Sequence, residues 1–149
     1  MQWLEYKEKF SEKASRNNYA QEEIDALLSY AKNLFDREIP IIYDQEHLAL
    51  LVGYQYKYLL RISNSPPSFY RTFKIPKKSG GKRSISEPLP TLKEIQHWIL
   101  AEILDRCPVS GYAKAYIRRR SIRKNAEFHV KRKVVLTIDI KDFFSFINL

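Results

Sequence analysis

A turn-rich connector, Ser63 to Ser68, is the feature that most constrains the fold, because the spacing of apolar residues changes across it. Before the connector, apolar residues recur at the three- and four-residue spacing of amphipathic helices, most clearly from about Ala20 to Phe35. After it, the segment from Phe69 to Ile75 has the composition and alternation of a strand. Helices followed by a strand-rich region predict an α+β fold.

Four helices are expected before the connector. The first covers residues 1–14, and the second covers residues 20–35 with Asn17 and Asn18 as its cap signal. Asp44 is expected to cap a third helix, which Gly53 ends, and residues 54–62 are expected to form a short fourth one.

Two further helices are expected after the connector. Thr91 and Glu94 match a capping box, with Thr91 at the N-cap, and predict a helix that runs to about Arg106. Residues 110–121 have no regular pattern, and Ser121 is expected to cap a helix over residues 121–130.

The strand at 69–75 is predicted to begin a β-hairpin whose return strand is residues 83–86. Gly80 and Gly81 lie in the turn, where they let backbone amides approach a ligand. Lysine and arginine side chains suit phosphate oxygens, so the hairpin is a candidate phosphate site; a solvated hairpin tip is the alternative. Its basic residues, with no acid among them, are Arg71, Lys74, Lys77, Lys78, Lys82 and Arg83.

Charge is segregated along the chain, whose formal net charge is +9. Residues 1–50 hold 6 Lys and Arg against 10 Asp and Glu, a net charge of −4. Residues 51–149 hold 20 against 7, a net charge of +13. A basic surface of this kind attracts nucleic acid or anionic lipid.

A second basic segment runs from Lys114 to Lys133, with nine basic residues and one acid, Glu127. Tyr112, Tyr116, Phe128 and His129 lie in or beside it. Basic residues interleaved with aromatic ones suit phosphate contact combined with base stacking. The alternative is a solvated basic helix face.

A β-branched apolar run, Val134 to Ile138, leads to Asp139 and predicts a strand. A carboxylate at the end of a strand is costly unless a cation or hydrogen bonds offset its desolvation, so a metal ion that faces a polyanion is one interpretation. An Asp that starts a turn or caps a helix is the other.

Several classes of protein are not favoured. No apolar run approaches the roughly 20 residues that span a bilayer, and the start of the chain is charged and unlike a signal peptide. The lone Cys107 fits a reducing cytoplasm, and none of the three histidines has a partner at metal-ligand or triad spacing. We therefore expect a cytoplasmic protein that does not contact a membrane.

Three segments in this order resemble the retron-type reverse transcriptases of bacteria and, more distantly, the enzymes of group II introns: YRTFKIPKKSGGKRSISEPLPTLKEIQHWIL, AKAYIRRRSIRKNAEFHV and VVLTIDIKDFFSFI. The resemblance implies an incomplete right-hand polymerase fold. Residues 1–64 would be an N-terminal helical segment, 65–133 the fingers, and 134–149 the start of the palm, with its first strand at 134–139. The implied activity is RNA-directed DNA polymerisation, with Mg²⁺ as cofactor and an RNA template, a DNA or RNA primer and dNTPs as partners.

The resemblance also implies roles at the nucleotide site. Asp139 matches a catalytic aspartate that binds Mg²⁺, and the carbonyl of Ile140 would be a further ligand. The residues implied to hold the incoming nucleotide are Lys77 and Arg83 on its phosphates, Asp142 and Phe143 through their amides, and Phe144 as a steric gate against the 2′-hydroxyl.

The expected contacts to template come from the hairpin and from the segment Arg118 to His129, which resembles the template-contacting part of the fingers. The residues predicted to bind nucleic acid are Lys74, Lys78, Arg118, Arg119, Arg120, Arg123 and Lys124.

One family motif, an aromatic-x-Asp-Asp turn, is absent from these 149 residues. Because one Asp cannot hold two Mg²⁺ ions, we expect the chain to be inactive alone and to need the remainder of the polymerase or a partner protein. A non-catalytic module that binds RNA or single-stranded DNA through residues 71–133 is the alternative, and an acidic helical half that docks a partner is a third possibility. The cognate RNA and the role (retron, antiviral defence or mobile element) stay open.

Overall fold

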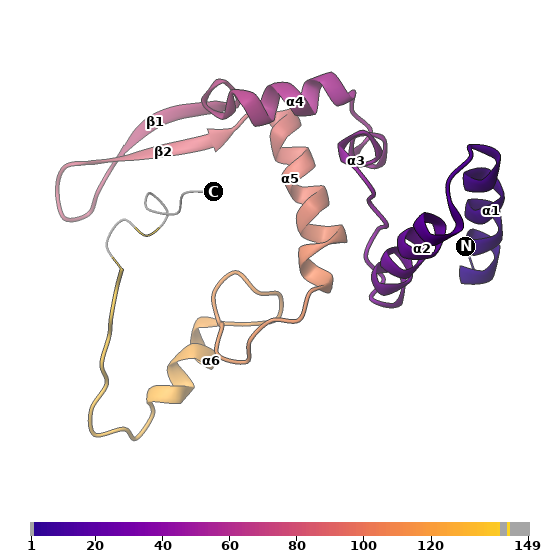
Figure 1. Cartoon of the computed structure of the whole chain (residues 1–149). Helices are drawn as coiled ribbons and strands as arrows, with labels where there is room; N and C mark the ends of the chain where they lie inside the picture. Colours follow the sequence, from indigo (N-terminus) through magenta and orange to yellow (C-terminus); the bar gives the residue numbers. More distant parts are fainter. Residues whose placement is uncertain (1, 141–142, 144–149) are drawn as a thin grey trace. The chain divides into compact units, whose positions relative to one another are not determined.

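The computed structural model describes residues 2–140 and 143, and within them the chain has six α-helices and one two-stranded antiparallel sheet (Figure 1). It divides into two compact units, Met1–Pro108 and Val109–Leu149. The first contains α1 to α5 and both strands, and the second contains α6. This composition agrees with the predicted α+β class. No helix in the described part of the chain is both long and apolar enough to cross a bilayer.

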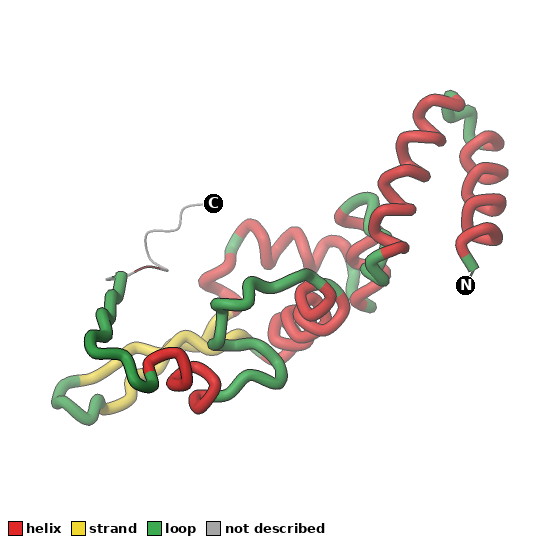
Figure 2. The backbone as a smooth tube through the Cα atoms, turned by 90° about the horizontal axis from the view of Figure 1, so that it is seen from below, coloured by secondary structure: helices red, strands yellow, loops and turns green. Residues whose placement is uncertain are grey.

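Helices α1 (Trp3–Arg16) and α2 (Gln21–Asp36) lie side by side (Figure 2). Ile24 is completely buried between them, together with Ala14 and Leu28. Trp3, Tyr6 and Phe10 pack over this core from α1, because residues three and four apart share one face of a helix. Both helices were predicted close to their observed bounds.

The predicted cap of α2 was wrong. Asn17 instead ends α1, where its side-chain amide donates to the carbonyl of Lys13 at 2.9 Å, and Asn18 adopts a left-handed conformation with φ 61°. Asparagine tolerates this conformation and often ends helices. Helix α2 begins after Ala20, whose amide donates to the Glu23 carboxylate at 3.0 Å.

Helices α3 (Gln45–Val52) and α4 (Tyr56–Asn64) follow as predicted. Asp44 caps α3 by accepting a hydrogen bond from the amide of His47 at 2.7 Å, and Gly53 ends it at φ 77°. Tyr43, which precedes the cap, stacks on Phe10 of α1 at 5.4 Å and shares a 2.7 Å hydroxyl–hydroxyl hydrogen bond with Tyr6. Burial and this hydrogen bond raise the pKa of Tyr43 above its ordinary value.

A short 3-10 helix, η1 (Pro66–Phe69), leads into β1 (Tyr70–Pro76), which pairs with β2 (Lys82–Pro88). The hairpin was predicted, and the register places Phe73 opposite Ile85. The turn is closed by the amide of Lys77, which donates to the carbonyl of Gly81 at 3.0 Å. Gly80 and Gly81 have φ values of 89° and 79°, a region that other residues rarely adopt.

Helix α5 (Pro90–Glu102) and the 3-10 helix η2 (Leu104–Arg106) complete the first unit. Leu92 and Ile95 are buried, since residues three apart share one face of the helix. The predicted capping box was wrong, because the helix begins at Pro90, whose fixed φ suits the first helical position. Glu94 accepts a hydrogen bond from the Tyr54 hydroxyl instead, and this bond raises the pKa of Tyr54.

The second unit holds α6 (Ile122–Ala126) and the 3-10 helix η3 (Glu127–His129). Ser121 caps α6 as predicted, since its hydroxyl accepts from the amide of Lys124 at 3.3 Å.

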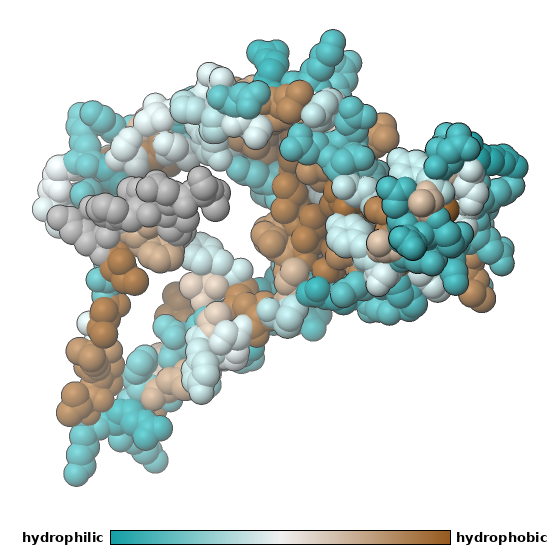
Figure 3. Space-filling model, in the orientation of Figure 1, coloured by the Kyte–Doolittle hydropathy of each residue, from teal (hydrophilic) through white to brown (hydrophobic). Residues whose placement is uncertain are grey.

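The strand predicted over residues 134–139 was wrong for this structure. Residues 134–140 are not assigned to any strand, and Figure 3 shows their apolar side chains as a brown run on the surface. Val134 is 84% exposed and Leu136 is 78% exposed. Branched residues favour strands only where a neighbour accepts their hydrogen bonds and covers one face. The two strands in the described residues pair with each other.

Candidate nucleic-acid and nucleotide site

The hairpin presents two chemically different faces, because successive side chains of a strand point to opposite sides. One face is apolar at its centre, with Phe73, Ile75 and Ile85. The other is polar, with Thr72, Lys74, Ser84 and Ser86, and the Thr72 and Ser86 hydroxyls lie 3.3 Å apart. Phe73 and Ile75 are 41% and 40% exposed, so the apolar face is only partly covered.

Arg71 is the one hairpin cation that the structure pairs with a carboxylate in the described residues. Its guanidinium donates to Glu87 on the opposite strand at 2.6 Å and lies 5.9 Å from the ring centre of Phe73. The hydrogen bond and the positive charge of Arg71 lower the pKa of Glu87 below its ordinary value. Arg71 therefore links the two strands of the hairpin, and its charge is already paired with that of Glu87.

The remaining hairpin cations are exposed and form no ion pair with a carboxylate in the described ranges, which leaves their charge available to a ligand. Lys77 and Lys78 lie in the turn, and Lys82 lies opposite Pro76 at its edge. Arg83 lies opposite Ile75, on the apolar face. The cations in question are Lys74, Lys77, Lys78, Lys82 and Arg83.

Lys82 was predicted only as one of the basic residues of the hairpin, without a role of its own, and the structure places it beside the turn with Lys77 and Lys78. The register alone reveals this, because it decides which basic residues gather at the tip. Arg83 and Lys82 are adjacent in sequence and so point to opposite faces.

The second unit carries the other predicted nucleic-acid residues on exposed backbone. Arg119 adopts a left-handed conformation with φ 61°, and the amide of Arg120 donates to the carbonyl of Ile117 at 3.2 Å. These two and Arg118 therefore lie in and around a tight turn before α6. Arg123 and Lys124 lie within α6, and the guanidinium Nε of Arg123 lies 3.7 Å from the carboxylate Oε1 of Glu127.

Aromatic side chains accompany these cations, as the interleaved pattern predicted. The ammonium of Lys114 lies 4.4 Å from the ring centre of Phe128, a cation–π contact. Tyr112 and Tyr116 are almost fully exposed. Exposed rings beside cations are the arrangement that single-stranded nucleic acid uses for stacking.

Asp139 and Ile140 are exposed in the unpaired segment that ends the continuous described range. A carboxylate and a backbone carbonyl are ligands that Mg²⁺ accepts, but octahedral coordination needs more protein ligands or water. Among the described residues, no three acidic, His or Cys side chains gather as a metal site. These residues supply at most part of a magnesium site.

The other predicted nucleotide-site residues are only partly described. Phe143 is 47% exposed, while Asp142 and Phe144 lie outside the described residues. The structure therefore brings together the hairpin cations in one unit and places Asp139 in the other. One feature was not predicted at all: a pocket at the base of the hairpin that includes Arg61.

Comparison with known proteins gives a consistent result. No protein-family model matches the chain. The retron Mx65 reverse transcriptase of Myxococcus xanthus is 37% identical over 110 residues, which cover 71% of this chain and 26% of that protein. The retron Mx162 reverse transcriptase of the same organism is 44% identical over 75 residues, which cover 50% of this chain and 16% of that protein.

A relative from a second genus agrees. The retron Ec73 reverse transcriptase of Escherichia coli is 38% identical over 84 residues, covering 55% of this chain and 26% of that protein. Over about half to 70% of its length, the chain is therefore similar to retron reverse transcriptases. It spans about a quarter or less of the length of these retron enzymes. The family resemblance seen in the motifs is thereby confirmed, while the roles of individual residues stay predictions.

Proposed function

We propose that this chain forms part of an RNA-directed DNA polymerase, which copies an RNA template into DNA from a DNA or RNA primer and dNTPs. The observation that carries the proposal is the identity of 37% with a retron reverse transcriptase over 110 residues, 71% of the chain. Residues 65–133 would act as fingers and residues 134–149 as the start of the palm. We place this activity in the cytoplasm.

In this proposal the hairpin tip holds the phosphates of the incoming nucleotide. Lys77 and Arg83 supply positive charge there, and the exposed tip lacks a carboxylate that would compete for it. Nucleotidyl transfer needs little covalent help from protein, so positioning and charge neutralisation are the main contributions of such cations.

The template would be held by the cations on the polar face of the hairpin, on its turn and around α6. Lys74 points from the polar face, while Lys78 lies in the turn. The contacts around α6 would come from Arg118, Arg119, Arg120, Arg123 and Lys124. Phosphate contacts of this kind fix the position of a strand without reading its sequence.

Asp139 and the carbonyl of Ile140 would contribute to a magnesium site. Bound Mg²⁺ neutralises the charge that develops on phosphate oxygens during transfer. The amides of Asp142 and Phe143 would lie near the phosphates, and the ring of Phe144 would exclude a ribose 2′-hydroxyl.

Primer extension tests this function. The enzyme for the assay joins this chain to the remaining sequence of the retron Mx65 reverse transcriptase, and the substrate is an RNA template with a DNA primer. We expect Asp139→Asn to abolish extension while RNA binding persists, because the substitution removes a metal-binding charge and leaves the cations intact.

The matched control is Glu22→Gln, which neutralises an exposed carboxylate on α2. It should leave extension unchanged. A protein with Asp139→Asn that still extends the primer at the parental rate contradicts the assignment of Asp139.

The exposed cations and rings also favour a second candidate, a non-catalytic module that binds RNA or single-stranded DNA through residues 71–133. It requires that the 149-residue chain binds nucleic acid with an affinity that falls steeply as salt rises. Charge reversal at Arg118, Arg119 and Arg120 together should weaken this binding, and an affinity independent of salt would argue against it.

A further inference from the structure

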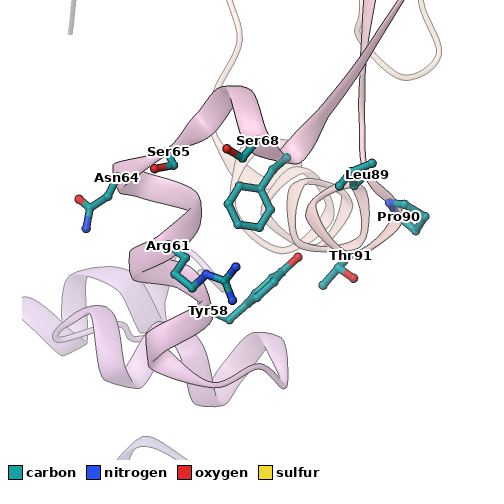
Figure 4. A pocket seen from close by; sticks show the side chains of 9 residues that line it. Tyr58, Arg61, Asn64, Ser65, Ser68, Leu89, Pro90 and Thr91 are labelled. Atoms are coloured by element: carbon teal, nitrogen blue, oxygen red, sulfur yellow. The ribbon is translucent and has the colours of Figure 1, made fainter.

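A pocket of about 630 Å³ lies at the base of the hairpin, where α4, η1 and the start of α5 meet (Figure 4). It belongs entirely to the first unit. Its volume falls in the range of small-ligand sites, roughly 300 to 1,000 Å³. Its polar lining comes from Tyr58, Arg61, Asn64, Ser65, Ser68 and Thr91, and its apolar lining from Phe69, Leu89 and Pro90.

Arg61 supplies the positive charge of the pocket. Figure 4 shows its guanidinium and the ring of Tyr58 extending from α4 toward Thr91. Arg61 forms no ion pair or side-chain hydrogen bond within the described residues, whereas Arg106 binds both Glu102 and the carbonyl of Glu38. An exposed, unpaired guanidinium in a pocket is a ready partner for a phosphate oxygen.

The pocket also offers aromatic surface. Phe69, which is buried, meets Tyr58 edge to face at 5.6 Å and 88°. These two rings form the apolar wall of the pocket, and the ring of Tyr58 also contacts the ring of Tyr54 at 5.7 Å. A nucleobase packs favourably on rings that are fixed in this way.

Short polar side chains complete the lining. The side chains of Asn64, Ser65 and Ser68 form no hydrogen bond with another residue in the described part of the chain, so their donors and acceptors are available. Hydroxyl and amide groups of this kind can both donate to and accept from a ribose 2′-hydroxyl.

We propose that this pocket binds one nucleotide of an RNA strand, with its phosphate on Arg61, its base against the Tyr58 and Phe69 wall, and its ribose beside Ser65 and Ser68. The proposal rests on the function proposed above and extends the RNA contact beyond residues 71–133. The site continues into the hairpin, because the amide of Leu89 donates to the carbonyl of Phe69 at 2.8 Å where the strands begin and end.

The test measures binding of a labelled 12-nucleotide RNA to the full 149-residue chain by fluorescence anisotropy over a range of salt concentrations. Arg61→Gln should weaken binding roughly tenfold, since a charge-assisted hydrogen bond is lost. It should also lower the slope of log affinity against log salt by about one, the value for one phosphate contact. Arg61→Lys should recover part of the affinity.

The matched control is Lys57→Gln, which removes one positive charge from the same helix but lies outside the pocket lining. It should change the affinity for RNA less than about twofold, because a charge at the rim of a binding surface contributes little to affinity. The DNA strand of the same sequence should bind more weakly than RNA, and Ser65→Ala with Ser68→Ala should reduce this preference. A 4-thiouridine in the RNA should crosslink to Tyr58 or Phe69.

The results that would contradict the pocket differ from those that would contradict the proposed function. If Arg61→Gln binds as the parent does while charge reversal at Arg118 to Arg120 weakens binding, the pocket is overturned and the proposed function stands. If Arg61→Gln and Lys57→Gln lose the same amount of RNA affinity, the pocket is also overturned, because the loss then reflects the net charge of the chain and not a contact inside the pocket. If Arg61 behaves as expected but Asp139→Asn leaves primer extension intact, the pocket stands and the polymerase assignment of Asp139 fails.

Discussion

The hairpin and the segment 134–140 have similar strand-forming sequences and different structures. β1 and β2 pair along seven residues each, whereas residues 134–140 belong to no strand. In the hairpin the partner follows within the same stretch of chain, after a turn with two glycines at positive φ. Residues 134–140 are not preceded by a glycine turn of this kind.

The contrast shows what a strand requires beyond propensity. The apolar run before Asp139 is richer in β-branched residues than β1, yet its side chains are exposed. Local closure of a two-stranded ladder costs little chain entropy, whereas pairing with a distant segment must be supported by burial. Turn chemistry therefore decides which of the two segments forms a strand.

The largest effect is expected from the turn itself. Replacing Gly80 and Gly81 together by valine should destabilise the hairpin by about 2–4 kcal/mol, because each position then places a β-branched residue at positive φ. An added Cβ at either position would meet no more distant part of the chain within 4 Å, so the cost arises from the local backbone conformation. Amide hydrogen exchange in β1 and β2 should rise toward the rate of residues 134–140.

Gly111→Val is the control for this experiment. Gly111 has no positive φ, and an added Cβ would also meet nothing within 4 Å. Its substitution should leave the amide hydrogen exchange rates of β1 and β2 unchanged. Slow exchange in the doubly substituted hairpin would show that strand pairing, rather than the turn, sets its stability.

A smaller effect is expected from the apolar side chains of the two regions. Phe73→Ala should cost about 1 kcal/mol, because it removes the pair with Ile85 and the contact with Arg71. Leu136→Ala should change stability by less than about 0.5 kcal/mol, since Leu136 is largely exposed. Thermal unfolding of the two variants compares them, and an equal loss would mean that the segment 134–140 is packed in solution.

Local sequence signals predicted much of the helical structure and the hairpin. The apolar spacing of α2, the Asp44 cap, the Gly53 stop and the glycine turn each act within a few residues, so the sequence contains the whole interaction. The caps of α2 and α5 were mispredicted because competing local choices, Asn18 in a left-handed conformation and Pro90 at the first helical position, took precedence.

The candidate site was less predictable, because availability of a charge depends on its neighbours. Arg71 and Lys74 look alike in the sequence, but the register pairs Arg71 with Glu87 and leaves Lys74 opposite Ser84. Arg61 resembles any polar residue of an amphipathic helix until α5 places Thr91 across from it. Asp142 and Phe144, whose roles came from family resemblance, lie outside the described residues and remain predictions.

The smallest expected effect is a pH dependence of the hairpin that residues 134–138 do not share. Because the Arg71 hydrogen bond lowers the pKa of Glu87, this pair stabilises the hairpin at pH values above the ordinary Glu pKa of about 4.3. The contribution is lost as the pH falls through the lower, folded-state pKa, since a protonated Glu87 no longer carries the charge that Arg71 binds. Residue-specific NMR shifts of the β1 and β2 amides should therefore change below about pH 4. In Glu87→Gln these shifts should stay flat over the same range, and an unchanged titration in that variant would assign the effect to another carboxyl group.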